Sequence, residues 1–201
     1  MSNNKTIVYY TCNRENENFE NKVKDRILKV GGGLPIVSVS QKPIDFGTNI
    51  CVGNLQQNYK NAFSQALMGC LAAKTDYVVM CEDDVLYPEH GYFDFKPKEK
   101  DVIYTYDNVW LMWDRENRTR FYKHGTTGGS IIIGRDFYVD FLKSGHNFFD
   151  KNLKWEKFSG EPMVNIKTRQ GVSFGTKIEN KAVGSLLNFG TVEDVKKNYL
   201  R

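Results

Sequence analysis

Hydrophobic and polar positions in the first half of the chain switch several times between the spacing of strands and that of helices. The strand-like runs cover residues 6–10, 34–39 and 77–79, the helical spacings cover residues 19–27 and 59–71, and residues 47–54 are expected to be a loop. Three glycines, Gly31 to Gly33, are expected to end the first helix. This order of strand, helix, strand, helix, strand predicts a parallel sheet with helices on its faces.

The second half of the chain shows strand candidates separated by short connections. These candidates cover residues 102–104, 109–112 and 130–133. Residues 135–143 and 161–167 are expected to form short helices, the second opened by Pro162. Thr191 and Asp194 have the spacing of a capping arrangement for a final helix. We therefore expect an α/β fold with a mostly parallel, Rossmann-like sheet flanked by helices and a mixed or antiparallel C-terminal portion.

Composition and charge narrow the class of protein only in part. The chain has 201 residues, 40% of them hydrophobic, which suits one domain with a full core. The formal net charge of +4 is mild and the basic residues are scattered, so the evidence for a nucleic-acid surface is weak. The four cysteines show no paired metal-binding spacing, and we expect them to be reduced. We find no apolar run long enough for a membrane span and no signal-peptide pattern at residues 1–5, and we expect a cytoplasmic protein.

The most informative motif is an acidic turn, Glu82-Asp83-Asp84, directly after the apolar run that ends in Cys81. Ligands of open α/β sheets bind at the carboxyl ends of the strands, where this turn is expected to lie. Neighbouring carboxylates repel one another, and a cation relieves that repulsion. The turn therefore predicts a site for Mg²⁺ or Mn²⁺, which take their remaining ligands from water and substrate phosphates. The alternative is a solvated acidic turn or a helix cap.

A second motif, Thr11-Cys12-Asn13-Arg14, follows the first predicted strand, and a helix separates it from the acidic turn. The two motifs in this order resemble glycosyltransferases of the GT-A fold, which carry a Thr-x-Asn-Arg type of turn and an Asp-x-Asp or Glu-Asp-Asp motif. The resemblance covers residues 6–88. It implies one GT-A-like domain over residues 1–201, with a nucleotide-sugar-binding half at 6–88 and an acceptor-side half at 89–201.

The resemblance also implies roles for individual residues. Asp84 would be a direct ligand of the divalent metal, Mn²⁺ or Mg²⁺, and Glu82 a second or water-mediated ligand. The residues expected along the nucleotide-sugar donor are Thr11, Asn13, Arg14, Asp45, Gln65 and Asp83. Asp83 would contact the ribose or the sugar. Arg14 would stack on the base or pair with a phosphate, and the alternative is a surface arginine that caps a helix.

Two positions depart from the pattern of the family. Related enzymes often carry Asp residues after the second strand to read the base, whereas this chain has Ser38 to Gln41 there and Asp45 only later. The helix before the acidic strand often supplies an Arg-Asn pair to the donor. Here Gln65 stands at that place, either as a substitute or as an ordinary exposed residue. The base of the nucleotide therefore stays open.

An inverting transfer needs a carboxylate that takes the proton of the acceptor hydroxyl. We expect Glu161 to be this base, because related inverting enzymes place it at a helix start, where the helix dipole holds a carboxylate ionised. The alternative is that Glu161 only complements the dipole. Asp140, Asp150 and Glu156 are competing carboxylates with weaker context.

Two further stretches of the chain would suit either a ligand-binding site or a purely structural role. Aromatic residues crowd residues 104–122, where they favour core packing over a platform for a sugar or base. His124 precedes the glycine-rich residues 125–129, whose backbone would approach the acceptor or form a flexible hairpin loop.

The resemblance predicts a hexosyl- or pentosyltransferase, and rival functions stay open. A sugar-phosphate nucleotidyltransferase shares the fold type, but such enzymes carry a Gly-rich loop where this chain has Asn13 to Asn16 without glycine. A noncatalytic nucleotide- or sugar-binding protein is the second rival. For a transferase, the acceptor would be a glycan, a lipid-linked sugar, a protein or a hydroxylated base of phage-type DNA.

Overall fold

The computed structural model describes residues 4–115, 118–145, 152–167 and 185–201. The strands are β1 (Lys5–Thr11), β2 (Ile36–Ser40), β3 (Thr48–Cys51), β4 (Tyr77–Glu82), β5 (Val85–Leu86), β6 (Val102–Tyr106), β7 (Val109–Arg115), β8 (Arg118–Gly125), β9 (Ile131–Gly134), β10 (Lys154–Phe158) and β11 (Met163–Lys167). The helices are α1 (Glu17–Val30), α2 (Tyr59–Ala72), α3 (Arg135–Ser144) and α4 (Val192–Val195), with a 3₁₀ turn η1 (Gly128–Ser130) and a π-helical turn η2 (Lys196–Leu200).

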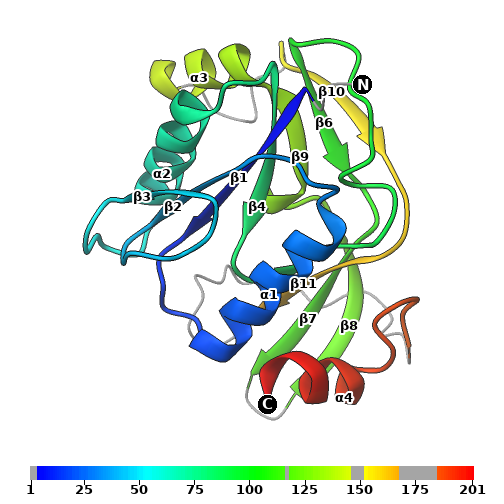
Figure 1. Ribbon diagram of the computed structural model, residues 1–201. Coiled ribbons are helices and arrows are strands. Elements are labelled where there is room, and N and C mark those ends of the chain that lie inside the picture. The colour runs from blue at the N-terminus through cyan, green and yellow to red at the C-terminus, as the bar shows by residue number, and fades with distance from the viewer. Residues whose placement is uncertain (1–3, 116–117, 146–151, 168–184) are drawn as a thin grey trace.

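The strands form two sheets (Figure 1). The larger sheet has seven strands in the order β10-β6-β9-β4-β1-β2-β3, and all neighbours run parallel except β9, which is antiparallel to β4 and β6. The smaller sheet has the order β5-β11-β7-β8. The prediction of an α/β fold with a mostly parallel sheet and a mixed later portion is confirmed.

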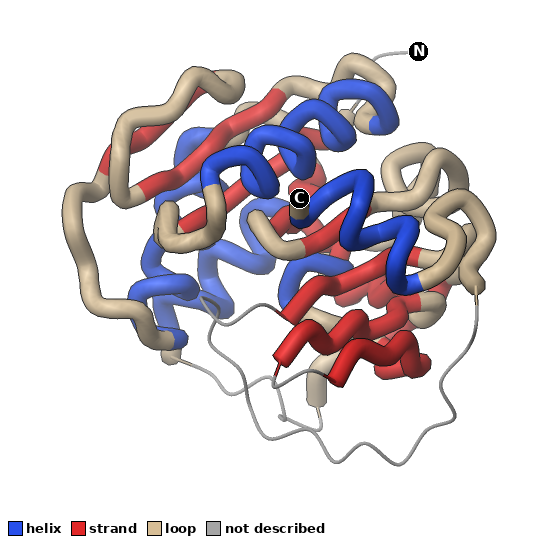
Figure 2. The backbone as a smooth tube through the Cα atoms, turned by 90° about the horizontal axis from the view of Figure 1, so that it is seen from below, coloured by secondary structure: helices blue, strands red, loops and turns tan. Residues whose placement is uncertain are grey.

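Helices cover both faces of the larger sheet because its strands are apolar on both faces (Figure 2). Along β1, the side chains of Ile7 and Tyr9 pack in the cluster that contains α1. The intervening Val8 packs on the opposite face, in the cluster that contains residues of α2 and α3. Successive strand residues point to opposite faces, so one strand contributes to both halves of the core.

The predicted ends of several helices agree with the local chemistry. The side chain of Asn16 caps α1 by accepting hydrogen bonds from the backbone N–H groups of residues 18 and 19. Gly31 follows the last residue of α1, as the run of glycines predicts. Thr191 and Asp194 form a reciprocal capping box at the start of α4. The C-terminal turn lies against the end of the molecule where α1 begins (Figure 1).

Two predictions of local structure are wrong. Residues 47–54 do not form a loop throughout, because Thr48–Cys51 pairs with β2 as an edge strand, and an edge strand needs no apolar run. Residues 161–167 are not a helix. Met163–Lys167 is β11, a strand between β5 and β7, and a short apolar run of this kind fits a strand as well as a helix.

The aromatic stretch serves the core. Tyr104, Tyr106, Phe121 and Tyr122 are almost fully buried. Within the described ranges, no helix has both the length and the apolar character needed to cross a bilayer.

Candidate functional site

A cleft of about 560 Å³ lies at the carboxyl ends of β1 and β4. Residues 82–84, the acidic turn, form one part of its wall, and residues 56–59 and 61–63, around the start of α2, form another. His124, residues 126–128 and Lys167, the last residue of β11, also line the cleft. This is the edge of a parallel sheet at which ligands of α/β proteins bind.

Glu82 is held in place from two directions. The hydroxyl of Tyr10 donates a hydrogen bond to Oε1 of Glu82 at 2.6 Å. Gly128 and Gly129 lie against the same side chain, and a Cβ atom at either glycine would come within 3.0 Å of it. The glycine-rich stretch therefore has a local purpose, because glycine lets this backbone approach the carboxylate.

Asp83 is bonded to the end of the neighbouring strand. The hydroxyl of Thr11 donates to Oδ2 of Asp83 at 2.5 Å and accepts a hydrogen bond from the backbone N–H of Asn13 at 2.8 Å. Thr11 and Asp83 both line the cleft. The two motifs found in the sequence are thus in direct contact.

The two carboxylate oxygens of Asp84 differ, because one forms an ion pair and the other has no partner among the described residues. Its Oδ2 is 2.9 Å from Nζ of Lys167, in an ion pair whose side chains are only 12% and 21% exposed. Its Oδ1 is buried and has no hydrogen-bond partner among the described residues. Buried carboxylate oxygens nearly always have a partner, so an unpaired one in a cleft wall is informative.

Burial, together with the crowding of carboxylates, raises the pKa values of Glu82 and Asp83. Burial raises the pKa of Glu82, and the charge of Asp84 raises it further, while Lys167 and the bond from Tyr10 oppose the shift. Burial also raises the pKa of Asp83 well above its usual range, again with Asp84 as the next cause. Removing these groups from water disfavours their charged forms, and a nearby cation would restore them.

Lys167 is a site residue that the sequence reading missed. Burial disfavours its charge, but the carboxylates of Asp84 and Glu82 outweigh that effect and raise its pKa. His124 also lines the cleft, and burial lowers its pKa. For Lys167, the available signal in the sequence was the alternation along β11, because Asn165 and Lys167 are polar positions two residues apart on one face of the strand.

Asn165 lies two residues before Lys167 and is fully buried. Neither its amide nitrogen nor its amide oxygen has a hydrogen-bond partner among the described residues. In the smaller sheet it pairs with Leu111, which lines the cleft, and with Val85, next to Asp84.

Asn13 and Gln65, both expected to touch the donor, make extensive contacts with the protein itself. Oδ1 of Asn13 accepts hydrogen bonds from the backbone N–H groups of Gln41 and Lys42, both at 2.9 Å. The backbone of Asn13 is left-handed, with φ of 51°. Gln65 is buried and donates through Nε2 to the carbonyl oxygens of Thr11 and Val39. Gln65 lines the cleft, whereas Asn13 is not among the residues that line it.

Arg14 and Asp45 lie on the surface. Arg14 reaches Gln57, a residue of the cleft lining, at 3.5 Å. Asp45 is not among the described residues that line the cleft. The donor contacts expected of Arg14 and Asp45 stay predictions.

Glu161 is not at a helix start, because the residues after it form β11. Its Oε2 accepts hydrogen bonds from the backbone N–H groups of Glu89 and His90 and from the side chain of Asn188. Glu161 is absent from the described lining of the cleft, so the structure does not bring it together with the acidic turn. The helix-dipole reason for choosing it was wrong, and its role as a base stays a prediction.

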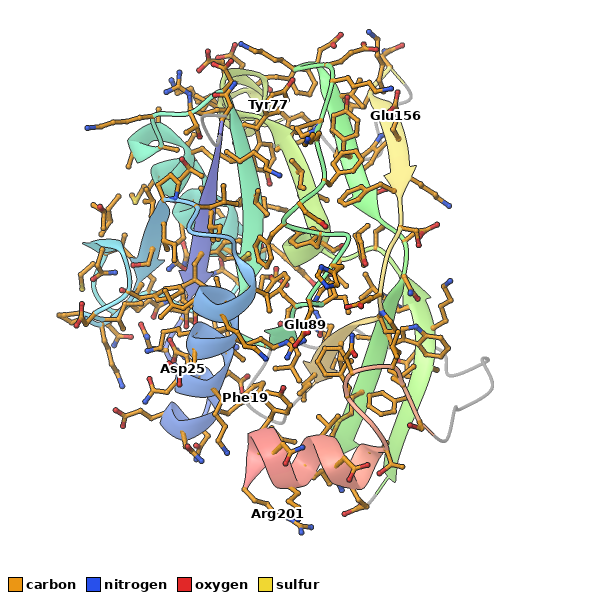
Figure 3. The ribbon with its side chains drawn as sticks, turned by 45° about the vertical axis from the view of Figure 1, so that its right-hand side comes forward. Phe19, Asp25, Tyr77, Glu89, Glu156 and Arg201 are labelled. Carbon is orange, nitrogen blue, oxygen red and sulfur yellow. The ribbon has the colours of Figure 1, made fainter. Side chains whose placement is uncertain are left out.

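The structure does not place the other candidates for the base, Asp140 and Glu156, at the cleft either. Asp140 and Glu156 are exposed, and Figure 3 shows Glu156 on β10, at the outer edge of the larger sheet. Neither lines the cleft. Asp150 lies outside the described residues.

The acidic turn offers enough ligands for a metal ion that is also held by water and substrate phosphates, but not for one held by protein side chains alone. In the described part of the chain, no group of three or more His, Cys, Asp or Glu side chains is arranged to hold a metal ion. However, Mg²⁺ and Mn²⁺ at phosphate-transfer sites commonly use one or two carboxylates together with water and substrate phosphates. The unpaired Oδ1 of Asp84 and the carboxylate of Glu82 fit that smaller requirement.

No protein-family model and no curated protein sequence matches the chain. Solved structures resemble its fold at low sequence identity. An inositol-1-phosphate CTP transferase from T. maritima has a TM-score of 0.49 and 11% identity, over 84% of this chain and 91% of that one. TarS 1–349 of S. aureus in complex with UDP-GlcNAc has a TM-score of 0.49 and 8% identity, over 82% and 58%.

A third structure, a glycosyltransferase involved in the glycosylation of the major capsid of PBCV-1, has a TM-score of 0.45 and 13% identity, over 74% of this chain and 69% of that one. At these values the similarity describes only the course of the chain. The function has to be argued from the site.

Proposed function

We propose that the protein is a glycosyltransferase that uses a nucleotide-sugar donor and a divalent metal, Mn²⁺ or Mg²⁺, bound at Asp84 and Glu82. One observation carries the proposal: Oδ1 of Asp84 is a buried carboxylate oxygen in the cleft wall without a partner among the described residues. Leaving such a group unpaired costs free energy. A cation bound from the cleft is the partner that this oxygen lacks.

The donor would bind with its diphosphate over the acidic turn. The metal would supply Lewis acidity and offset the charge that builds up on the leaving diphosphate. The protein's own contribution is rigidity: Tyr10 holds Glu82 and Thr11 holds Asp83, so the carboxylates need not reorganise when the donor binds. The expected contact of Asp83 with the ribose or sugar belongs to this proposal.

The rest of the cleft suits the other parts of a nucleotide-sugar. Its volume of about 560 Å³ is in the range of small-molecule sites. Tyr59 and Phe63 of α2 and Trp155 of β10 line it, and aromatic faces stack well on sugar rings and bases.

The first experiment is a thermal-shift panel of nucleoside diphosphates and nucleotide-sugars, each with Mn²⁺, with Mg²⁺ and with a chelator. A ligand that binds only the folded protein raises the melting temperature. We expect at least one nucleotide-sugar to do so only with the metal present. If no nucleotide-sugar gives a metal-dependent shift, the proposal is wrong.

The second experiment separates the rival functions by their products. A glycosyltransferase releases a nucleoside diphosphate when a glycan, lipid-linked sugar, protein or hydroxylated DNA base is supplied as acceptor. A nucleotidyltransferase releases pyrophosphate from a nucleoside triphosphate and a sugar phosphate. Binding without either product across the acceptors would identify a noncatalytic binding protein. The anomeric configuration of the product would show whether the transfer inverts.

A further inference from the structure

The ion pair between Asp84 and Lys167 is built into the cleft rather than formed on the surface. Lys167 is the last residue of β11, and Asp84 immediately precedes β5, its neighbour in the smaller sheet. The backbone N–H of Ile166 donates to the carbonyl oxygen of Asp84 at 2.7 Å, which fixes the two chain segments side by side. Both side chains are largely buried, so water screens the pair little.

The charges that line the cleft make Lys167 important for any anionic ligand. The described lining carries four carboxylates, those of Glu15, Glu82, Asp83 and Asp84. Among the described residues of that lining, Lys167 is the only lysine or arginine. A diphosphate therefore meets a strongly negative surface unless Lys167 and a bound cation face it.

A metal ion and the Lys167 ammonium would compete for the same carboxylate. Oδ2 of Asp84 holds the ammonium, and its unpaired Oδ1 is only one carboxylate width away. A divalent ion at Oδ1 would repel an ammonium at Oδ2. Lysine has a flexible stem and three rotatable donors, so it can move its charge to another oxygen nearby.

We propose that Lys167 is a counter-ion that changes partner, an inference that rests on the proposed function. In the free protein it neutralises Asp84. When metal and donor bind, the metal takes over Asp84 and the Lys167 ammonium pairs with the diphosphate of the donor.

This exchange couples the two ligands. Without donor, the metal has to displace an ammonium that finds no new partner, so metal binding is weakened. With donor, the displaced ammonium gains the diphosphate, so each ligand strengthens the binding of the other. Lys167 would then stabilise the charge that develops on the leaving diphosphate.

The test uses the full-length protein with Lys167→Met, and with Lys60→Met as a matched control. Lys60 is an exposed lysine in the first turn of α2 and does not line the described cleft. Two equilibria are measured: Mn²⁺ binding without nucleotide, by electron paramagnetic resonance, and nucleoside diphosphate binding at saturating Mn²⁺, by calorimetry.

The two equilibria should change in opposite directions. Lys167→Met should tighten Mn²⁺ binding by about tenfold, because a competing positive charge is gone, and weaken diphosphate binding by about tenfold. Lys167→Arg should keep most of the diphosphate affinity, and Lys60→Met should change neither value. If Lys167→Met does not fold, Lys167→Gln has the same two expectations and keeps a polar end beside Asp84.

Unchanged or weaker Mn²⁺ binding in the Lys167 variant would overturn the inference, and so would unchanged diphosphate binding. Absence of Mn²⁺ binding in both the variant and the unmodified protein would overturn it as well. If Mn²⁺ binds and responds to Lys167→Met but no nucleoside diphosphate binds, the competition at Asp84 stands and the proposed function fails.

Discussion

Polar side chains at the end of β1 and polar side chains around β11 differ in whether their hydrogen bonds are satisfied, and both groups include a residue outside the described cleft lining, Asn13 and Asn165 respectively. On the β1 side, Thr11, Asn13 and Gln65 hydrogen-bond to other groups of the protein. On the β11 side, Oδ1 of Asp84 and both amide atoms of Asn165 are buried without a partner among the described residues. The first side is satisfied without a ligand, and the second is not.

This difference indicates which residues hold the shape of the protein and which are available to bind a ligand. Satisfied hydrogen bonds fix the geometry of the strand ends but leave little capacity for a ligand. Buried groups without partners cost free energy, and proteins keep them mainly where a ligand, ion or water completes them. We therefore expect substitutions on the β1 side to lower stability and substitutions on the β11 side to lower ligand affinity.

The largest expected effect is on the β11 side. Asp84→Asn keeps the size of the side chain and removes its charge, so nucleoside diphosphate binding at saturating Mn²⁺ should weaken by about 1,000-fold. Calorimetry measures this affinity. Asp25→Asn, on the exposed surface of α1 (Figure 3), is the matched control and should bind as the unmodified protein does. Equal affinities for the two variants would contradict the assignment of Asp84.

The next effect concerns the β1 side. Asn13→Ala removes hydrogen bonds to two backbone N–H groups and forces alanine into a left-handed backbone, so the free energy of unfolding should fall by about 3 kcal/mol. Asn13→Gly tolerates that backbone and should lose about 2 kcal/mol. Urea denaturation measures both. Arg14→Ala is the control, and a loss there as large as that of Asn13→Ala would refute the comparison.

Glu161 tests whether a satisfied carboxylate is structural. Its Oε2 accepts two backbone N–H groups, so Glu161→Gln should lower the free energy of unfolding by about 1 kcal/mol. Because Glu161 is outside the described cleft lining, a rate of transfer close to normal would identify it as a purely structural carboxylate. A fall in kcat of about 100-fold or more, with donor affinity kept, would confirm its predicted role as the base.

The smallest effect is a dependence of stability on pH. Burial raises the pKa of Asp83, so above about pH 4 the folded protein keeps a proton that the unfolded chain has released. This contribution is present at acid pH and is lost as pH rises through the raised pKa. Asp83→Asn should flatten the decline and stabilise the protein at neutral pH, which urea denaturation across the pH range measures. Identical pH profiles for the variant and the unmodified protein would show that Asp83 is not the cause.

Part of the site was predictable from the sequence because each motif directly follows an apolar strand. Thr11 and Asp83 come at the ends of two such runs, and parallel neighbours bring those ends together. The bonds of Asn13 to residues 41 and 42 depend on how β2 ends beside β1, which the pattern of polar positions does not describe.

The β11 side was missed for a physical reason. Lys167 is far from Asp84 along the chain, and the reading of residues 161–167 as a helix hid the alternation that puts Asn165 and Lys167 on one face. Five residues are too few for periodicity to distinguish a helix from a strand. The pairing of β11 with β5 and β7, a long-range contact, decides the outcome.

The most direct test of the metal site at Asp84 is a crystal structure with Mn²⁺ and the nucleoside diphosphate that binds best. We expect an anomalous metal peak bonded to Oδ1 of Asp84, with Nζ of Lys167 moved from Asp84 to a phosphate oxygen. A nucleotide bound outside the cleft, or a metal held by residues other than the acidic turn, would contradict that assignment.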